Sequence, residues 1–216
     1  MLLYHSFGPN PRAARMFLLE KGLTLPTREL DIMNAENRRR PYTDMNPGGQ
    51  MPALLLDDGR CIAETVAIFE YLEEKHPNPP LIGSTPEERA ETRMWQRRVE
   101  LNITENLYAG FRFAEGAELF RSRIHIIPQS AADLKAIVQE RLAWLNGLIA
   151  GRNYIAPDRF TIADIILYCA LDFGASAGQK FDPALANIAR WFERIGSRPS
   201  AKESLHPQAE QSGLRG

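Results

Sequence analysis

The chain has 216 residues, 25 % of them charged, and a net charge of −1, which argues against a nucleic-acid partner because phosphate binding needs an excess of Lys and Arg. Two distant cysteines, Cys61 and Cys169, give neither a disulfide framework nor the spacing of a metal site, which favours a reducing compartment. The first residues do not resemble a signal peptide and no apolar run reaches the ~20 residues of a membrane span, so we expect a soluble cytoplasmic protein without a metal.

The N-terminal third begins with a predicted strand, helix and strand. Leu2–Tyr4 is short and apolar, as is typical of a buried strand. After a loop, Ser6–Asn10, Pro11 predicts the first turn of an amphipathic helix that ends at Gly22. Leu25–Leu30 is expected to form an edge strand because it contains a proline, which cannot donate to a sheet ladder.

A turn and a β-hairpin follow. Asn46–Ala53 holds two consecutive glycines between prolines, so it must be irregular. Two apolar runs, Ala53–Leu56 and Cys61–Ala63, are separated by Asp57–Gly59, a pattern that predicts a hairpin. Met51-Pro52 stands at the mouth of the first strand. The bond between them can be cis there, which would open the Met51 N–H and C=O to an extended peptide.

The hairpin leads directly into a second amphipathic helix. Glu64-Thr65 opens this helix, and the apolar residues Ile68, Phe69 and Leu72 lie on one side of it. Glu64 and Thr65 therefore stand at a helix N-terminus, where free N–H groups and the helix dipole favour a bound carboxylate.

The rest of the chain has helical periodicity. Residues 77–85 are rich in proline and predict a linker. The segments expected beyond it are a helix from Pro86, capped by Thr85, to about Phe113, with a bend; a helix from Pro128 to Ile149, closed by Gly151; a helix opened by Phe160 to Asp164; a helix over Pro183–Ile195; and a loose tail over His206–Gly216. Thr161 and Asp164 have the spacing of a capping box.

These features together resemble the glutathione S-transferase superfamily. Two short motifs, separated by the hairpin, are similar to that family's glutathione site. They are Asn-Pro-x-Gly-x-x-Pro-x-Leu at residues 46–54 and Glu-Thr-x-Ala-Ile-x-x-Tyr-Leu at residues 64–72. Thr161 and Asp164 resemble a motif at the start of the family's buried central helix. The resemblance implies an α/β plus all-α fold: a thioredoxin-like domain with βαβ-ββα order over residues 1–76, a linker over 77–85, an all-helical domain over 86–216, and a homodimer.

The same resemblance implies glutathione in the cleft between the domains. Met51, next to Pro52, would pair its backbone with the cysteinyl residue of the tripeptide. Thr65 would take the γ-glutamyl carboxylate and Glu64 the ammonium group. Gln50 would contact the glycyl end, and the run Arg38–Arg40, with Arg40 as the chosen residue, lies where relatives place a cation for the glycyl carboxylate. A run of like charges can equally be a solvated surface.

The thiol of glutathione must be ionised, because only the thiolate attacks. Lowering a pKa of about 8.5 by ~2 units needs roughly 2.7 kcal/mol, which one charge-assisted hydrogen bond and a helix N-terminus can supply. The candidate donors are Ser6 and Asn10, in the loop before the first helix. The alternatives are a backbone-bonded hydroxyl for Ser6 and a helix cap for Asn10. The loop contains no cysteine, which argues against a mixed disulfide with the enzyme.

Tyr108, Phe111 and Arg112, late in the first long helix, are predicted to line the pocket for the second substrate, although aromatic residues at helical spacing also form cores. The expected activity is a glutathione transferase that conjugates glutathione to a small hydrophobic electrophile. Glutathione-dependent reduction of a disulfide or peroxide at the same site is one alternative. A non-catalytic binding or assembly module is another, but such a protein would be expected to lose Glu64-Thr65 or the open Met51-Pro52 edge.

Overall fold

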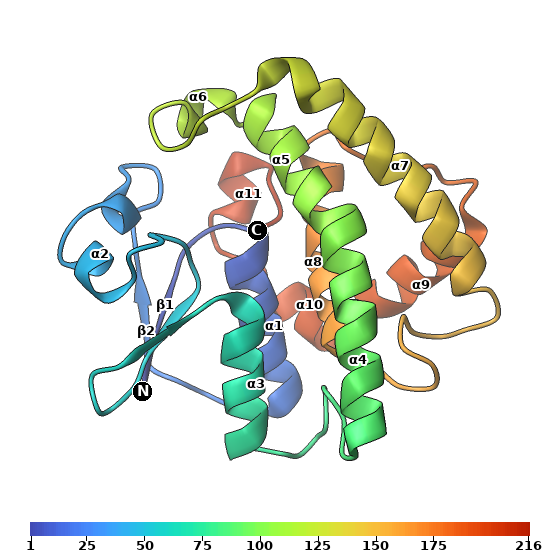
Figure 1. Ribbon diagram of the computed structural model, residues 1–216, viewed down its shortest axis with the longest axis horizontal. Helices are drawn as coiled ribbons and strands as arrows, with labels where there is room; N and C mark the ends of the chain where they lie inside the picture. The colour runs from blue at the N-terminus through green and yellow to red at the C-terminus, as the bar shows by residue number, and fades with distance from the viewer.

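The chain folds into a four-stranded sheet with helices beside it, followed by an all-helical region (Figure 1). The computed structural model describes residues 1–216. The strands are β1 (Leu2–His5), β2 (Thr27–Glu29), β3 (Ala53–Leu55) and β4 (Cys61–Ala63). The helices are α1 (Pro9–Lys21), α2 (Tyr42–Met45), α3 (Thr65–Lys75), α4 (Pro86–Val99), α5 (Glu105–Phe113), α6 (Ala117–Phe120), α7 (Ala131–Leu148), α8 (Ile162–Ser176), α9 (Ala186–Gly196), α10 (Pro199–Glu203) and α11 (Ala209–Ser212). Three short helical segments are η1 (Glu36–Arg38), η2 (Glu100–Thr104) and η3 (Pro128–Ser130).

The sheet has the strand order β2-β1-β3-β4, which confirms the predicted thioredoxin-like βαβ-ββα arrangement. β1 and β2 are parallel, whereas β3 pairs antiparallel with both β1 and β4. The edge strand β2 is shorter than predicted. Pro26 contributes only its carbonyl, which accepts a hydrogen bond from the Leu3 N–H at 2.9 Å, so the regular ladder starts one residue later.

The predicted hairpin is confirmed, and its register is defined. Ala53 pairs with Ala63 and Leu55 with Cys61, and the Leu56 N–H donates to the Arg60 carbonyl at 2.8 Å to close the turn. The Met51–Pro52 peptide bond is cis.

Helix α1 starts two residues earlier than the sequence predicted. Gly8, at φ 136°, is its N-cap and Pro9 its first residue, because a proline suits the first turn whether it is Pro9 or Pro11. The predicted end is confirmed: Gly22 adopts the left-handed conformation with φ 62°, and its N–H donates to carbonyls of the last turn.

The capping predictions for the helical domain are also confirmed. Thr85 and Glu88 form a reciprocal capping box at the start of α4, and Thr161 and Asp164 form one at the start of α8. The predicted long helix is continuous, with the π-helical segment η2 joining α4 to α5. Two boundaries differ from expectation: Pro128–Ser130 is a 3-10 turn before α7, and α9 begins at Ala186 because a turn bonded to the Asp182 carboxylate precedes it.

Helix α8 is the buried centre of the helical domain, and α1 packs against it. The carboxylate of Asp164 is fully buried and accepts hydrogen bonds from the Ile155 N–H at 2.9 Å and the Trp191 indole at 2.8 Å, in addition to the capping contacts. Burial raises the pKa of Asp164 to about 6. No helix of the structure combines the length and the apolarity needed to cross a bilayer.

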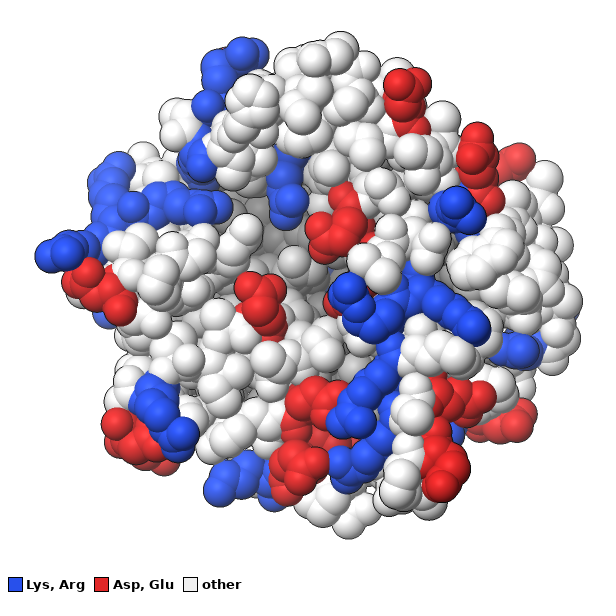
Figure 2. Space-filling view, in the orientation of Figure 1, with Lys and Arg blue, Asp and Glu red and all other residues white.

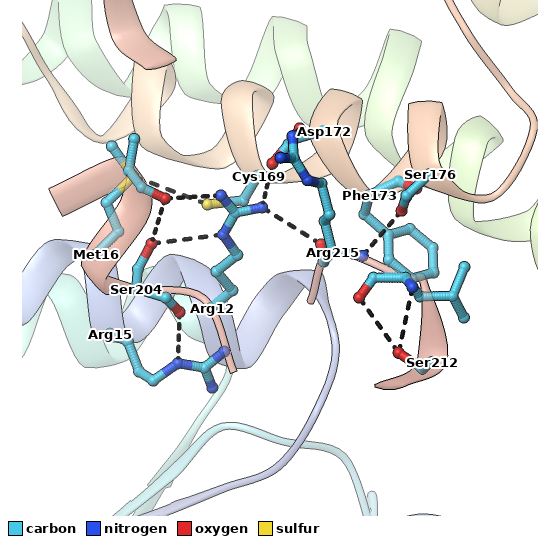
Figure 3. Close-up of polar contacts among 12 residues, drawn as sticks. Arg12, Arg15, Met16, Cys169, Asp172, Phe173, Ser176, Ser204, Ser212 and Arg215 are labelled. Carbon is cyan, nitrogen blue, oxygen red and sulfur yellow. Dashed lines mark hydrogen bonds and ion pairs between the residues drawn. The ribbon is translucent and has the colours of Figure 1, made fainter. Parts of the chain in front are cut away.

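A buried ion pair joins the two domains. The Arg12 guanidinium on α1 donates to the Asp172 carboxylate on α8 at 2.6 Å, and the two side chains are 1 % and 3 % exposed (Figure 3). Arg12 also donates to the Ala201 carbonyl at 2.9 Å. A second buried pair, Lys21–Glu73 at 2.8 Å, lies beneath the linker, where Glu73 accepts from the Ile82 N–H.

The prediction of a loose tail over His206–Gly216 is wrong. This segment forms α11 and folds back onto the start of α1 (Figures 1 and 3). Arg215 pairs with Asp172 at 2.8 Å and accepts a hydrogen bond from Arg12 on its carbonyl. His206 is buried, and its N–H donates to the Gly216 carbonyl at 3.1 Å. The tail is ordered because its partners are buried charges far away in sequence, which composition alone does not reveal.

Candidate functional site

A cavity with a volume of about 550 Å³ lies between the sheet domain and the helical domain. Asn10, Gln50 and Met51 line it on one side, and Tyr108 and Arg112 of α5 on the other. Figure 2 shows a hollow near the centre of this face, with basic side chains at its upper edge and over the region of α2. Residues from both domains therefore converge on one space.

Met51 offers an open backbone edge at this cavity. Its N–H and C=O make no hydrogen bond within the protein, although the side chain is largely buried. The regular ladder of β3 begins two residues later, at Ala53. A buried stretch of backbone with an unpaired donor and acceptor needs a partner, and an extended peptide can supply both groups at once.

The turn before Met51 is held by side chains on its inner side. The Asn46 amide donates to the Gln50 carbonyl at 2.8 Å, and the Asn37 amide donates to the Gly49 carbonyl at 2.6 Å. Gly49 has φ 58°, and a Cβ there would lie 2.8 Å from the Asn37 carbonyl oxygen, so only glycine fits. The turn therefore presents the Gln50 side chain to solvent at the edge of the cavity.

The N-terminus of α3 follows directly on the ladder of β3 and β4. Ala53 pairs with Ala63 at the end of this ladder, so Pro52 and Glu64 are the first residues beyond it on the two segments. Glu64 is exposed, has φ 71° and makes no side-chain cap bond, so the first N–H groups of α3 have no side-chain partner. A non-glycine residue at such a φ is strained, and strain of this kind is often retained at ligand sites.

Few donors are free at the N-terminus of α1. Pro9 and Pro11 have no N–H, and the Arg12 N–H already donates to the Gly8 carbonyl at 3.0 Å. Asn10 lines the cavity, and neither its N–H nor its side-chain amide is used within the protein. Within α1, Asn10 alone therefore brings free donors to this space.

Five residues singled out from the sequence do not line the cavity: Ser6, Arg40, Pro52, Glu64 and Thr65. The Ser6 hydroxyl is 1 % exposed and donates to the Leu30 carbonyl at 2.6 Å, which is the backbone role considered for it. The Arg40 side chain is 85 % exposed and pairs with Asp44 at 3.0 Å. Of the three consecutive arginines it is Arg38 that lines the cavity, where its guanidinium donates to the Gly48 carbonyl at 3.0 Å.

The helical wall of the cavity is aromatic. Phe111 packs edge-to-face against Phe173, with ring centroids 4.9 Å apart. Tyr108 is 5 % exposed, and burial raises its pKa well above the ordinary value, so its phenol is protonated. The Arg112 guanidinium lies 6.0 Å from the Tyr108 ring and 5.8 Å from the Phe120 ring. The three residues predicted for this wall all line the cavity.

Other lining residues were missed by sequence reasoning. Arg123, in the loop after α6, and Gln208 and Leu214 of the tail all reach the cavity. Arg123 donates to the carbonyls of Ile32 at 2.7 Å and of Met33 at 3.0 Å, a contact across about ninety positions of sequence that no local pattern indicates. His, Cys, Asp and Glu residues form no group of three or more that could hold a metal ion.

Comparison with known proteins gives a consistent result. Residues 7–75 match the family model for the N-terminal domain of glutathione S-transferase, and residues 117–199 match the model for its C-terminal domain. The glutathione S-transferase GstA of Escherichia coli is 30 % identical over 212 residues, covering 95 % of this chain and 97 % of its own. A solved glutathione S-transferase domain-containing protein from Marinobacter aquaeolei is 35 % identical, with a TM-score of 0.86 over 93 % of this chain and 99 % of its own. The solved structure of Gtt2 from Saccharomyces cerevisiae has a TM-score of 0.88 at 26 % identity, covering 95 % of this chain and all of that one.

Similar proteins also carry other names. Maleylacetoacetate isomerase from Pseudomonas aeruginosa is 29 % identical and covers 89 % of both chains. Relatives of this chain therefore share a fold and differ in their named activities.

Proposed function

The chain belongs to the glutathione S-transferase superfamily, and from this premise we propose that it binds reduced glutathione and transfers the thiolate to a small electrophile. The observation that carries the proposal is the open N–H and C=O of Met51, together with the uncapped N-terminus of α3 that follows the same ladder. This arrangement suits a tripeptide that pairs with the edge through its cysteinyl residue.

The two ends of glutathione would bind different charges. The γ-glutamyl carboxylate would accept hydrogen bonds from the first N–H groups of α3 and from Thr65, while Glu64 would take the ammonium group. The glycyl carboxylate would lie toward Gln50 and Arg38, which replaces Arg40 in this role because it lines the cavity. Pro52 would follow this edge without adding a donor, since proline has no N–H.

The thiolate would lie at the N-terminus of α1. The free N–H and side-chain amide of Asn10 support it as the donor that stabilises the thiolate, together with the positive end of the α1 dipole. Ser6 drops out of this role because its hydroxyl donates to a backbone carbonyl. The thiolate and the electrophile would meet against Tyr108 and Phe111, so catalysis would consist of thiol activation and proximity.

Turnover with two substrate types tests the reaction. In the presence of reduced glutathione we expect conjugation of an aryl halide such as 1-chloro-2,4-dinitrobenzene to exceed reduction of a small disulfide such as hydroxyethyl disulfide. The opposite ranking would favour the glutathione-dependent reductase. Turnover of neither substrate, with glutathione bound, would favour a non-catalytic binding module.

The proposal also includes a homodimer in the cytoplasm. Two large apolar side chains remain exposed along one helical stretch: Met94 of α4 is 40 % exposed and Leu101 of η2 is 59 % exposed. Such residues are commonly covered by a second copy. Sedimentation at micromolar concentration should give the mass of a dimer, and a monomer would contradict this part of the proposal.

A further inference from the structure

The cavity carries more positive charge than the protein itself neutralises. Its wall contains three arginines, Arg38, Arg112 and Arg123, and one carboxylate, Glu115. Glu115 is already engaged: its two oxygens contact the Lys135 ammonium and the Gln179 amide. None of the three arginines forms an ion pair, whereas Arg121, two residues before Arg123, pairs with Glu118 outside the cavity.

Each of the three guanidinium groups is held in a different way. Arg38 packs against the Gly48-Gly49 turn, at the expected glycyl end of glutathione. Arg123 is fixed by two carbonyls, and its Nε atom is buried without a partner. Arg112 lies over two aromatic rings and donates to no protein group. Glutathione as proposed above uses Arg38, which leaves Arg112 and Arg123 on the acceptor side.

The electrostatics of the cavity agree with this assignment. Burial and the nearby charge of Arg112 lower the pKa of Arg38. Burial and the charge of Arg38 likewise lower the pKa of Arg123, and the charge of Asp31 partly offsets this lowering. Three like charges that repel one another around an apolar space favour an anion between them. Figure 2 shows Lys or Arg side chains at the upper edge of the hollow.

We propose that the acceptor substrate is an anionic aromatic electrophile, whose carboxylate binds Arg112 with the support of Arg123 while its ring packs on Phe111 and Phe120. This inference rests on the proposed glutathione transfer. An arginine recognises a carboxylate through two parallel hydrogen bonds, which a neutral amide cannot reproduce. Discrimination should therefore depend on the charge of the substrate and not on its size.

A matched pair of aryl chlorides provides the probe: 4-chloro-3-nitrobenzoate and 4-chloro-3-nitrobenzamide. In the transfer step the sulfur of the glutathione thiolate forms a bond to the ring carbon that carries chlorine, the C–Cl bond breaks, and chloride leaves with the bonding pair. The thiol proton is released to solvent when the thiolate forms. Both chlorides undergo the same reaction, but a carboxamide withdraws electrons from the ring more strongly than a carboxylate does. Affinities therefore report on recognition of the carboxylate, and rates are compared only between protein variants.

Binding is measured first, by calorimetry, on protein saturated with S-methylglutathione, which cannot react, and also on the free protein. We expect the benzoate to bind at least about tenfold more tightly than the benzamide, as one charge-assisted hydrogen bond would give. In Arg112→Gln the affinities for the benzoate and the benzamide should differ by no more than about twofold. Arg121→Gln, which removes the same charge outside the cavity, should keep the wild-type preference. The benzoate-to-benzamide ratio of kcat/KM should fall in Arg112→Gln and keep its wild-type value in Arg121→Gln, because the intrinsic reactivities of the two chlorides cancel in this comparison.

Two results would overturn the inference. One is equal affinity of wild-type protein for the two probes. The other is an Arg112→Gln variant in which the affinities for both probes, or the rates of both reactions, fall by the same factor. This would make Arg112 a thiolate-stabilising or structural residue. Failure of glutathione itself to bind would reject the proposed function instead. The comparison of the two probes on free protein would still decide whether the cavity selects anions.

Discussion

Ala53 pairs with Ala63 across the antiparallel ladder of β3 and β4, and this register determines where the two parts of the proposed glutathione site meet. One residue beyond the pair in each strand lie Pro52 and Glu64, at the cis-proline edge and at the start of α3. A slip of one residue would turn the edge and the helix N-terminus away from each other, because side chains alternate between the two faces of a strand.

Glu64 combines backbone strain with the proposed ammonium contact. Glycine tolerates φ 71° better than any other residue, so Glu64→Gly should raise the free energy of unfolding by about 1 kcal/mol. The same variant should lose glutathione affinity by about tenfold or more, since an ion-paired ammonium group loses its partner. Denaturant unfolding and calorimetry measure the two quantities. Glu64→Ala is the control, because it keeps the strain and removes the carboxylate; wild-type affinity in this variant would contradict the assignment.

The buried pair between Arg12 and Asp172 should dominate the stability of the domain contact. Asp172→Asn leaves the Arg12 charge buried without a counter-ion, so the free energy of unfolding should fall by about 3–5 kcal/mol. Arg215 also loses its partner, so the tail should become accessible to proteases. Glu118→Gln breaks a pair with Arg121 at the surface and should change stability very little. Similar losses of unfolding free energy in the two variants would show that burial does not determine how much an ion pair contributes to stability.

Asp164 should make stability depend on pH. Its folded pKa of about 6 lies above the usual value for aspartate, so the folded state binds this proton more tightly than the unfolded state does. This contribution is fully present below about pH 4 and is lost as the pH rises through about 6, with a total of up to about 3 kcal/mol. Relative to Asp164→Asn, the wild-type protein should therefore gain stability between pH 7 and pH 4. A relative loss over that range would mean that the donors around the carboxylate outweigh its burial.

Asn10 should control ionisation of bound glutathione. Asn10→Ala removes the side-chain amide at the start of α1, and we expect the pKa of the bound thiol to rise by about one unit or more, which is roughly 1.4 kcal/mol. An ultraviolet titration of the thiolate measures the shift. Ser6→Ala serves as the control and should leave the pKa of the bound thiol unchanged, because the Ser6 hydroxyl donates to the Leu30 carbonyl. A shift in Ser6→Ala and none in Asn10→Ala would reverse the two roles.

Local signals in the sequence predicted most of the fold. The helix cap at Thr85, the capping box at Thr161, the αL glycine at Gly22 and the turn before Met51 depend on neighbouring residues, so their patterns are visible in a short window. The candidate site was predicted in part for the same reason: the residues around Met51 and at the start of α3 form two short motifs.

What the sequence did not reveal depends on distant partners. Which arginine of Arg38–Arg40 faces the cavity is decided by the close packing of Arg38 on the Gly48-Gly49 turn, and the three look alike in sequence. The segment 206–216 looks like a loose tail until Asp172 is placed next to Arg215. Such contacts between far segments are created only when the two domains pack together.

Amide hydrogen exchange at Met51, followed by NMR with and without reduced glutathione, tests the central claim most directly. In the free protein the Met51 N–H has no hydrogen-bond partner. If glutathione pairs with this edge, exchange of that amide should slow by about tenfold or more at saturating ligand, while exchange of the exposed Asp58 amide in the hairpin turn should not change. Saturable binding of glutathione without protection of the Met51 amide would contradict the proposed mode of binding, and the absence of binding at millimolar glutathione would contradict the proposed function.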